Sequence, residues 1–166
     1  ALAADAVDLA IMGRPPRTRE TVAASFAPHP LVVIAAPGHP LARRPRLPVA
    51  ALSDESFLVR EPGSGTRTAM QDYFDEHGAV VRIGMEMASN ETIKQAVMAG
   101  MGVAFISRHT IELELATKRL ALLDVQGLPV MREWFVVHLA AKRLSPTAQA
   151  FREFVLKHGR AMLAKR

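Results

Sequence analysis

The chain has 166 residues, of which 49% are apolar and 22% are charged. At about 150 residues per domain, this length fits one domain or two small subdomains, and the composition is that of a folded protein. The sequence contains no cysteine, which excludes disulfides, thiolate metal sites and a cysteine nucleophile. Its apolar stretches fall far short of the roughly 18 residues that cross a bilayer, so no membrane partner is expected.

The positive charge is concentrated at the C-terminal end. Lys and Arg number 21 against 16 Asp and Glu, a net charge of +5. The residues after 153 include no acidic side chain and four basic ones, Lys157, Arg160, Lys165 and Arg166, so the first 153 residues carry 17 basic and 16 acidic groups. A nucleic-acid-binding face needs clustered Lys and Arg. The body of the chain is therefore not expected to contact DNA.

Apolar periodicity predicts strands that alternate with helices. The predicted strands are 7–11, 21–27, 31–36, 56–60, 80–87, 103–106, 120–125 and 131–141. Four helices are predicted. The first follows residue 67 and has an apolar stripe of Met70, Tyr73, Phe74 and His77, and the second begins at Ser89 with Ile93, Ala96, Val97 and Met101 on one face. The third covers 107–117, and the last begins at Ser145-Pro146. This alternation predicts an α/β fold with a mostly parallel sheet, in which ligands bind beyond the carboxyl ends of the strands.

The beginning of the chain indicates a fragment. Residues 1–11 fit the end of a helix that runs into a short strand, and they have no signal-peptide pattern. The polar, proline-rich segment 13–20 is predicted to be a loop. We therefore expect the chain to open in the middle of an α/β unit.

The stretch 60–67 is the best candidate for a binding site. A strand, a glycine-flanked serine and a helix follow one another there, which leaves the amides of the first helical turn free to bind an anion. Gly65 permits a close approach, and Ser64 and Thr66 add hydroxyl donors. Arg67 lies in the positive first turn, where an anionic ligand would offset its charge. The alternative is that Ser64 only caps the helix and Arg67 is solvated.

A second helix start offers further polar groups. Ser89 and Asn90 follow a predicted strand, so their side chains and the free amides could face the same site. Capping of the helix alone also explains Ser89, so a capping role and a ligand-binding role both remain possible interpretations.

Templates for catalysis and metal binding fit poorly. The chain has no G-x-S-x-G elbow, no phosphate-binding G-x-x-x-x-G-K-[ST] loop, no complete G-x-G-x-x-G and no helical zinc motif. His29 and His39 precede prolines, which favours turn roles, and His138 is expected to be a structural histidine in a strand. Glu112 and Glu114 are expected on a solvated helix face. We therefore expect no enzyme, no catalytic residue, no metal and no cofactor.

Several segments resemble one known family in their order along the chain. They are VDLAI at 7–11, LVVIAAPGHPLA at 31–42, FLVREPGSGTR at 57–67, SNETIKQAVMAGMGVAFIS at 89–107 and LSPTAQAFREFV at 144–155. Together they resemble the C-terminal effector-binding half of LysR-type transcriptional regulators. The GSGTR and SNETIKQAV segments look most like the regulators of Calvin-cycle (RuBisCO) operons.

The resemblance implies two α/β subdomains of the periplasmic-binding-protein type (type 2), with a small effector between them. On this alignment, 1–13 is the end of subdomain I, 14–141 is subdomain II and 142–166 returns to subdomain I. The effector contacts fall on Ser64, Gly65, Thr66 and Arg67, with Ser89 and Asn90 near the cleft.

The family also implies partners and a location. The effector would be a small anionic metabolite, such as a phosphorylated sugar, phosphoenolpyruvate, ATP or NADPH. A cytoplasmic homo-oligomer, a dimer or tetramer when full-length, would bind DNA through an N-terminal helix-turn-helix domain that these residues do not include. A solute-binding protein of a transport system with the same fold is the alternative.

Overall fold

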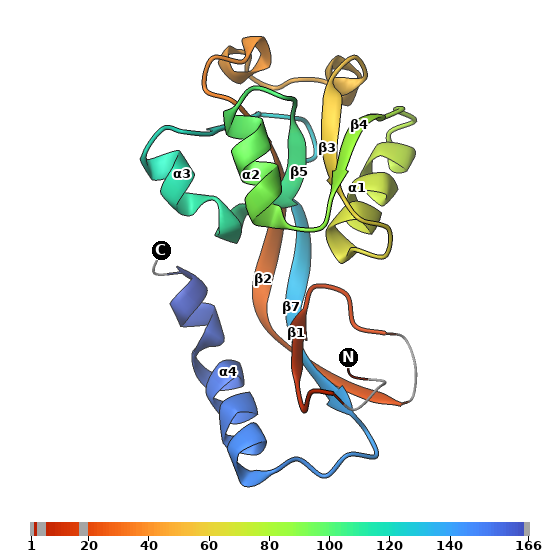
Figure 1. The fold of residues 1–166 in the computed structure, drawn as a ribbon, viewed down its shortest axis with the longest axis vertical. Coiled ribbons are helices and arrows are strands. Elements are labelled where there is room, and N and C mark those ends of the chain that lie inside the picture. Colours follow the sequence, from red (N-terminus) through yellow and green to blue (C-terminus); the bar gives the residue numbers. More distant parts are fainter. Residues whose placement is uncertain (1, 3–5, 17–19, 165–166) are drawn as a thin grey trace. The chain divides into compact units, whose positions relative to one another are not determined.

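The computed structural model describes residues 2, 6–16 and 20–164, which belong to two compact units (Figure 1). One unit is drawn from the residues up to His29 and from Arg132 onward, and the other is Pro30–Met131. The strands are β1 (Ala10–Met12), β2 (Thr21–Ala35), β3 (Ser56–Arg60), β4 (Arg82–Met87), β5 (Ala104–Ser107), β6 (Ala121–Leu122) and β7 (Val130–Leu139). The helices are α1 (Gly65–Glu76), α2 (Asn90–Met98), α3 (Glu112–Ala116) and α4 (Pro146–Ala164), with 3-10 turns η1 (Pro40–Arg43), η2 (Val49–Leu52) and η3 (Arg108–Thr110).

The sheet of the unit Pro30–Met131 has a parallel centre. β3 pairs in parallel with β4, and Phe57 forms a parallel bridge with Val103 at the start of β5. β2 is antiparallel to β5, with Leu31 opposite Ser107, and β6 is antiparallel to β2. The predicted α/β fold is thus confirmed, but the expectation of a mostly parallel sheet is wrong outside β3, β4 and β5. The apolar pattern of a buried strand does not encode its direction.

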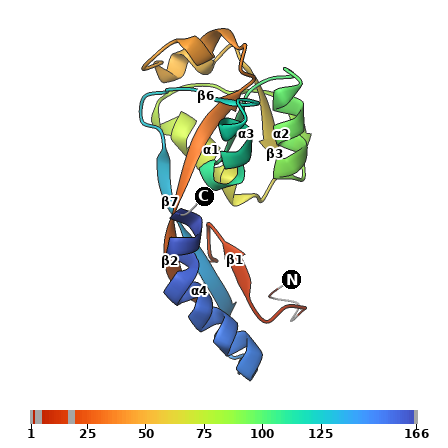
Figure 2. The same ribbon diagram turned by 90° about the vertical axis from the view of Figure 1, so that its left-hand side faces the viewer.

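Two apolar layers cover the faces of this sheet, because successive side chains of a strand point to opposite faces. α1, η1 and η2 lie over the face that holds Val33, Phe57 and Phe105. α2 and α3 lie over the face that holds Ile34, Leu58 and Ile106. Figure 2 shows α1 and α2 on opposite sides of β3.

The predicted buried stripes of α1 and α2 are confirmed for most of their residues. Met70, Tyr73 and Phe74 of α1 and Ile93, Ala96 and Val97 of α2 are buried. His77 is the C-cap of α1, followed by Gly78 with a φ of +60°, which is where a helix favours glycine. The prediction that Met101 belongs to the buried face of α2 is wrong, because this residue lies beyond α2 in a turn and is 49% exposed.

This topology creates a switch point between β3 and β4. The chain leaves the carboxyl end of β3 through α1 on one face, and it leaves the carboxyl end of β4 through α2 on the other. In α/β sheets, ligands bind where the connections of neighbouring parallel strands diverge in this way. The two candidate helix starts therefore flank one edge of the sheet.

The other unit contains β1, the first part of β2, β7 from Arg132 onward, and α4. β1 is antiparallel to β7, with Ala10 opposite Val137. α4 packs on β2 at Gly159, where an added Cβ would lie 2.5 Å from the ring of Phe26. The predicted start of this helix is confirmed, since the Ala148 amide donates to Ser145 Oγ over 3.2 Å.

Several predicted elements differ in extent. The segments 21–27 and 31–36 form one strand, β2, because Pro28 and Pro30 are two residues apart and their missing donors face the same edge. The first strand is shifted to Ala10–Met12, and 120–125 contains only the short β6. The helix predicted over 107–117 is divided into η3 and α3 at Ile111, whose φ of −123° is not helical.

Some predictions fall on residues 1, 3–5, 17–19 and 165–166, which lie outside the described residues. They are the helix end at the start of the chain, the middle of the loop 13–20, and the basic side chains of Lys165 and Arg166. Within the part of the chain that the structure describes, no helix is long and apolar enough to span a membrane.

Candidate functional site

A tight turn connects β3 to α1. The Ser64 amide donates to the Glu61 carbonyl oxygen over 3.2 Å, with Pro62 and Gly63 at the two central positions. Gly63 has a φ of +88°, which fits the third position of a type II turn and favours glycine there. The sequence E-P-G-S therefore ends the strand and places Ser64 at the N-cap of α1.

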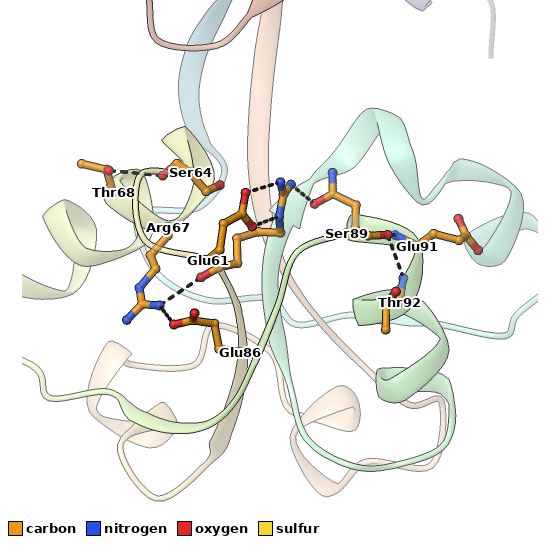
Figure 3. Close-up of polar contacts among 10 residues, drawn as sticks. Glu61, Ser64, Arg67, Thr68, Glu86, Ser89, Glu91 and Thr92 are labelled. Carbon is orange, nitrogen blue, oxygen red and sulfur yellow. Dashed lines mark hydrogen bonds and ion pairs between the residues drawn. The ribbon is translucent and has the colours of Figure 1, made fainter. Parts of the chain in front are cut away.

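The start of α1 is open, in contrast to the start of α2. Ser89 Oγ accepts hydrogen bonds from the Glu91 and Thr92 amides over 3.1 and 3.3 Å, so it caps α2 (Figure 3). Ser64 occupies the same N-cap position on α1, but its side chain makes no capping hydrogen bond. Among the described residues, no side chain caps the first turn of α1, whose amides belong to Gly65, Thr66 and Arg67. The positive end of this helix is free to bind an anion.

Arg60, the last residue of β3, joins the two helix starts. Its Nε and Nη2 donate to the Glu61 carboxylate over 2.7 and 2.9 Å, a bidentate pair. Its Nη1 donates to Asn90 Oδ1, at the first residue of α2, over 2.8 Å. The guanidinium thus links the turn before α1 to the start of α2, across the switch point between β3 and β4.

Arg67 is directed away from the open helix start. Its Nη1 donates to the Arg60 carbonyl oxygen over 3.0 Å and to Glu86 Oε2, in β4, over 2.5 Å. Figure 3 shows this side chain turned toward Glu86, away from Ser64. A cation in the first turn of a helix is unfavourable, and here Glu86 offsets its charge. Arg67 is neither simply solvated nor in contact with the free amides.

The charged side chains of the site are balanced. The carboxylates of Glu61 and Glu86 neutralise the guanidinium groups of Arg60 and Arg67. The hydrogen bond from Arg60 lowers the pKa of Glu61 below its usual value of 4.5, so this carboxylate is ionised at neutral pH. The uncapped amides of α1 therefore remain as the unbalanced positive group of the site.

A largely buried ion cluster holds α2 against α3. Lys94 Nζ lies 2.8 Å from Glu114 Oε1 and 2.8 Å from Glu91 Oε2. Burial opposes the charge of Lys94, but the hydrogen bonds to Glu114 and Glu91 outweigh it and raise the Lys94 pKa. The expectation that Glu114 is solvated is wrong, because its side chain is buried against Lys94. Lys94 comes from a different helix, so the spacing of residues within 107–117 cannot reveal this partner.

The six predicted site residues occupy the two helix starts that flank the switch point. Ser64, Gly65, Thr66 and Arg67 lie at the start of α1, and Ser89 and Asn90 lie at the start of α2. Sequence reasoning did not select Arg60, Glu61 or Glu86. The available signal for Arg60 was a basic side chain at the end of an apolar strand, directly before the turn.

Three of the histidines, His29, His39 and His138, have structural surroundings. His39 Nδ1 accepts from the Leu41 amide over 3.3 Å, which confirms its turn role, and His138 Nδ1 lies 3.0 Å from the Leu139 carbonyl oxygen. His29 is not in a turn: it is buried in β2, and its ring stacks on Trp134 with centroids 3.8 Å apart. No group of three His, Asp or Glu side chains in the described ranges could hold a metal ion.

An α/β domain with an open helix start at its switch point defines a class of small-molecule-binding domains. The family model of the LysR substrate binding domain matches residues 1–160, and the chain belongs to this family. The resemblance found in the sequence is thereby confirmed.

Relatives in this family are named as transcriptional regulators. The chain is 52% identical over 161 residues to a RuBisCO operon transcriptional regulator of Allochromatium vinosum, which covers 97% of this chain and 53% of that relative. It is 52% identical over 151 residues to the HTH-type transcriptional regulator CbbR of Rhodospirillum rubrum, covering 91% and 50%. The chain thus spans about half the length of these curated relatives. Both are named as regulators and not as enzymes, in line with the sequence prediction.

Solved structures show the same fold. The regulatory domain of Synechocystis PCC6803 CcmR, solved in complex with 2-PG, has a TM-score of 0.87 at 42% identity and covers 94% of this chain and 75% of that chain. The effector-binding domain of QuiR, in complex with shikimate, has a TM-score of 0.83 at 23% identity, covers 95% and 74%, and supports the fold alone.

Proposed function

We propose that this chain senses a small anionic metabolite for a LysR-type transcriptional regulator. The observation that carries the proposal is the open start of α1, beside a cation at the switch point of the sheet. A phosphorylated carboxylate such as 2-phosphoglycolate suits this site, because a phosphate monoester carries a charge of about −1.5 to −2 and has three acceptor oxygens. The CcmR regulatory domain, solved with 2-PG, supports this class of ligand.

Each predicted residue has a role in this proposal. The amides of Gly65, Thr66 and Arg67 donate to the anion, and the Ser64 and Thr66 hydroxyls add donors. Asn90 holds Arg60, whose guanidinium pairs with the ligand in place of Glu61 when the ligand binds, and Ser89 fixes the start of α2. In the proposed binding state, the Arg67 side chain keeps its bond to Glu86, and Arg67 contributes its backbone amide to the anion.

The subdomain scheme 1–13, 14–141 and 142–166 remains part of the proposal. An effector that prefers one arrangement of the two subdomains would shift the population of conformations, and thereby the arrangement of subunits on DNA. DNA contact is assigned to an N-terminal helix-turn-helix domain outside this chain. The relatives named as RuBisCO operon regulators support control of CO2-fixation genes. Because a regulator of genes must reach DNA, we place the full-length protein in the cytoplasm.

A homo-oligomer is supported by the edge of the sheet at β4. Among the described strands, β4 pairs with β3 alone, and its apolar side chains Ile83 and Met85 are 46% and 41% exposed. Val80, just before the strand, is 80% exposed. Exposed edge strands with apolar side chains favour association with another chain. We assign this edge to contacts in a dimer or tetramer of the full-length protein.

The proposal is tested by placing a carboxylate at the open helix start. Thr66→Asp puts a negative charge among the free amides, where it stabilises the helix but repels a bound anion. We expect the intact regulator that contains this chain to lose about tenfold or more of its affinity for 2-phosphoglycolate in titration calorimetry. Gln71→Glu, which adds the same charge on the exposed side of α1, is the control. Equal affinity of Thr66→Asp and the unsubstituted protein would refute the site.

A further inference from the structure

The guanidinium of Arg60 already holds an anion that belongs to the chain. Glu61 contributes both carboxylate oxygens, and Asn90 takes the remaining Nη1. Bidentate pairing of this kind occupies the edge of a guanidinium that a phosphate or carboxylate ligand would use. A ligand that needs Arg60 must therefore displace Glu61.

Glu61 can leave without disturbing the framework of the site. Its side chain is 37% exposed, and its partner is the preceding residue, so a change of rotamer suffices to release it. Arg60 stays in place because Asn90 binds its Nη1 and Arg67 binds its carbonyl oxygen. Glu61 also begins the turn whose fourth residue, Ser64, is the N-cap of α1. The Arg60 guanidinium and the free amides are therefore joined by this one short turn.

Glu86, the other carboxylate of the site, is not placed to compete with a ligand for Arg60. It binds Arg67, whose guanidinium is directed toward β4 and away from Ser64 (Figure 3). Removing Glu86 would leave Arg67 as an unbalanced cation in the first turn of α1, and the Arg67 side chain is only 15% exposed. Glu61 is thus the carboxylate placed to compete with a ligand, while Glu86 stabilises the helix start.

We propose that Glu61 is an internal competitor that occupies Arg60 in the unliganded state and sets the affinity of the site for phosphorylated carboxylates. This inference rests on the proposed function. Binding of the ligand breaks the Arg60–Glu61 pair, forms an Arg60–ligand pair and turns the Glu61 carboxylate into solvent. The resident carboxylate thereby raises the ligand concentration at which the site fills.

The test is a double-mutant cycle on the intact regulator, with 2-phosphoglycolate as the probe. Glu61→Gln removes the competing charge, and we expect it to tighten binding about two- to fivefold in titration calorimetry, the range of an exposed ion pair. In the Arg60→Gln background, where no guanidinium can be released, the same substitution should leave the affinity unchanged. Glu91→Gln is the matched control: it removes an equal charge near the start of α2, but from a carboxylate that pairs with Lys94.

The outcomes separate this inference from the proposed function. An unchanged or weakened affinity of Glu61→Gln, with binding retained, would overturn the competitor role alone. An equal gain for Glu91→Gln, or a gain that persists with Arg60→Gln, would show a long-range charge effect and would also overturn it. If 2-phosphoglycolate fails to bind the unsubstituted regulator and every variant, the ligand class fails and this inference fails with it. Circular dichroism melting of each variant checks that the fold is unchanged.

Discussion

The two N-cap serines should respond very differently to the same substitution. Ser89 Oγ accepts from two amides of α2, over 3.1 and 3.3 Å, while the side chain of Ser64 caps no amide of α1. Loss of a capping side chain costs about 1 kcal/mol of stability. We therefore expect Ser89→Ala to lower the free energy of unfolding by about 1 kcal/mol, and Ser64→Ala to change it by less than about 0.5 kcal/mol.

Urea unfolding of the purified chain, followed by circular dichroism, measures both values. For a chain of this size, the Ser89→Ala change corresponds to a fall of about 2–4 °C in Tm. Each serine is the control for the other, since the substitution removes the same hydroxyl from the same helical position. An equal loss in both variants would show that Ser64 does cap α1, and the reasoning that its first-turn amides are open would be refuted.

Three further predictions concern the framework around the site. Lys94→Met leaves Glu114 without its buried cation and should lower the free energy of unfolding in urea by about 3 kcal/mol, whereas the double variant Lys94→Met with Glu114→Leu should recover most of this loss. Equal stability of the single and the double variant would contradict the ion-pair account. The Lys94 pKa is raised above its usual 10.5, so the stability that its charge contributes should be complete below pH 10.5 and should disappear as the pH rises through the higher folded-state pKa. Unfolding of the parent chain and of Lys94→Met at several pH values measures this contribution. Gly102→Ala should cost about 2–4 kcal/mol, because its Cβ would lie 2.2 Å from the Ser56 carbonyl oxygen, while Gly38→Ala, with open space around it, should change little in the same assay.

The sequence predicted those parts of the site that depend on local chemistry. The buried stripe of α1, the cap at Ser89 and the glycine that ends α1 follow from spacing within a few residues. The strand Ser56–Arg60 was predicted with its observed bounds, because its apolar run is bordered by a turn sequence. These elements place both helix starts correctly along the chain.

The parts that were missed depend on residues far apart in the sequence. Arg60 meets Asn90 only because β3 and β4 are neighbours, and Arg67 meets Glu86 for the same reason. Arg67 was expected to need a ligand to offset its charge, whereas β4 supplies a carboxylate. The antiparallel direction of β2 was missed similarly, since an apolar strand has the same pattern in either direction. Charge partners and strand direction come from topology, which spacing does not reveal.

The central claim is that a phosphorylated carboxylate binds the open start of α1. The most direct measurement is an amide proton–nitrogen NMR titration of the regulator with 2-phosphoglycolate, because an anion in hydrogen-bond contact shifts the resonances of the amides that donate to it. The account predicts the largest saturable shifts at Gly65, Thr66 and Arg67, with smaller changes at the capped amides of Glu91 and Thr92. Saturable shifts elsewhere in the chain, with these three amides unchanged, would contradict it.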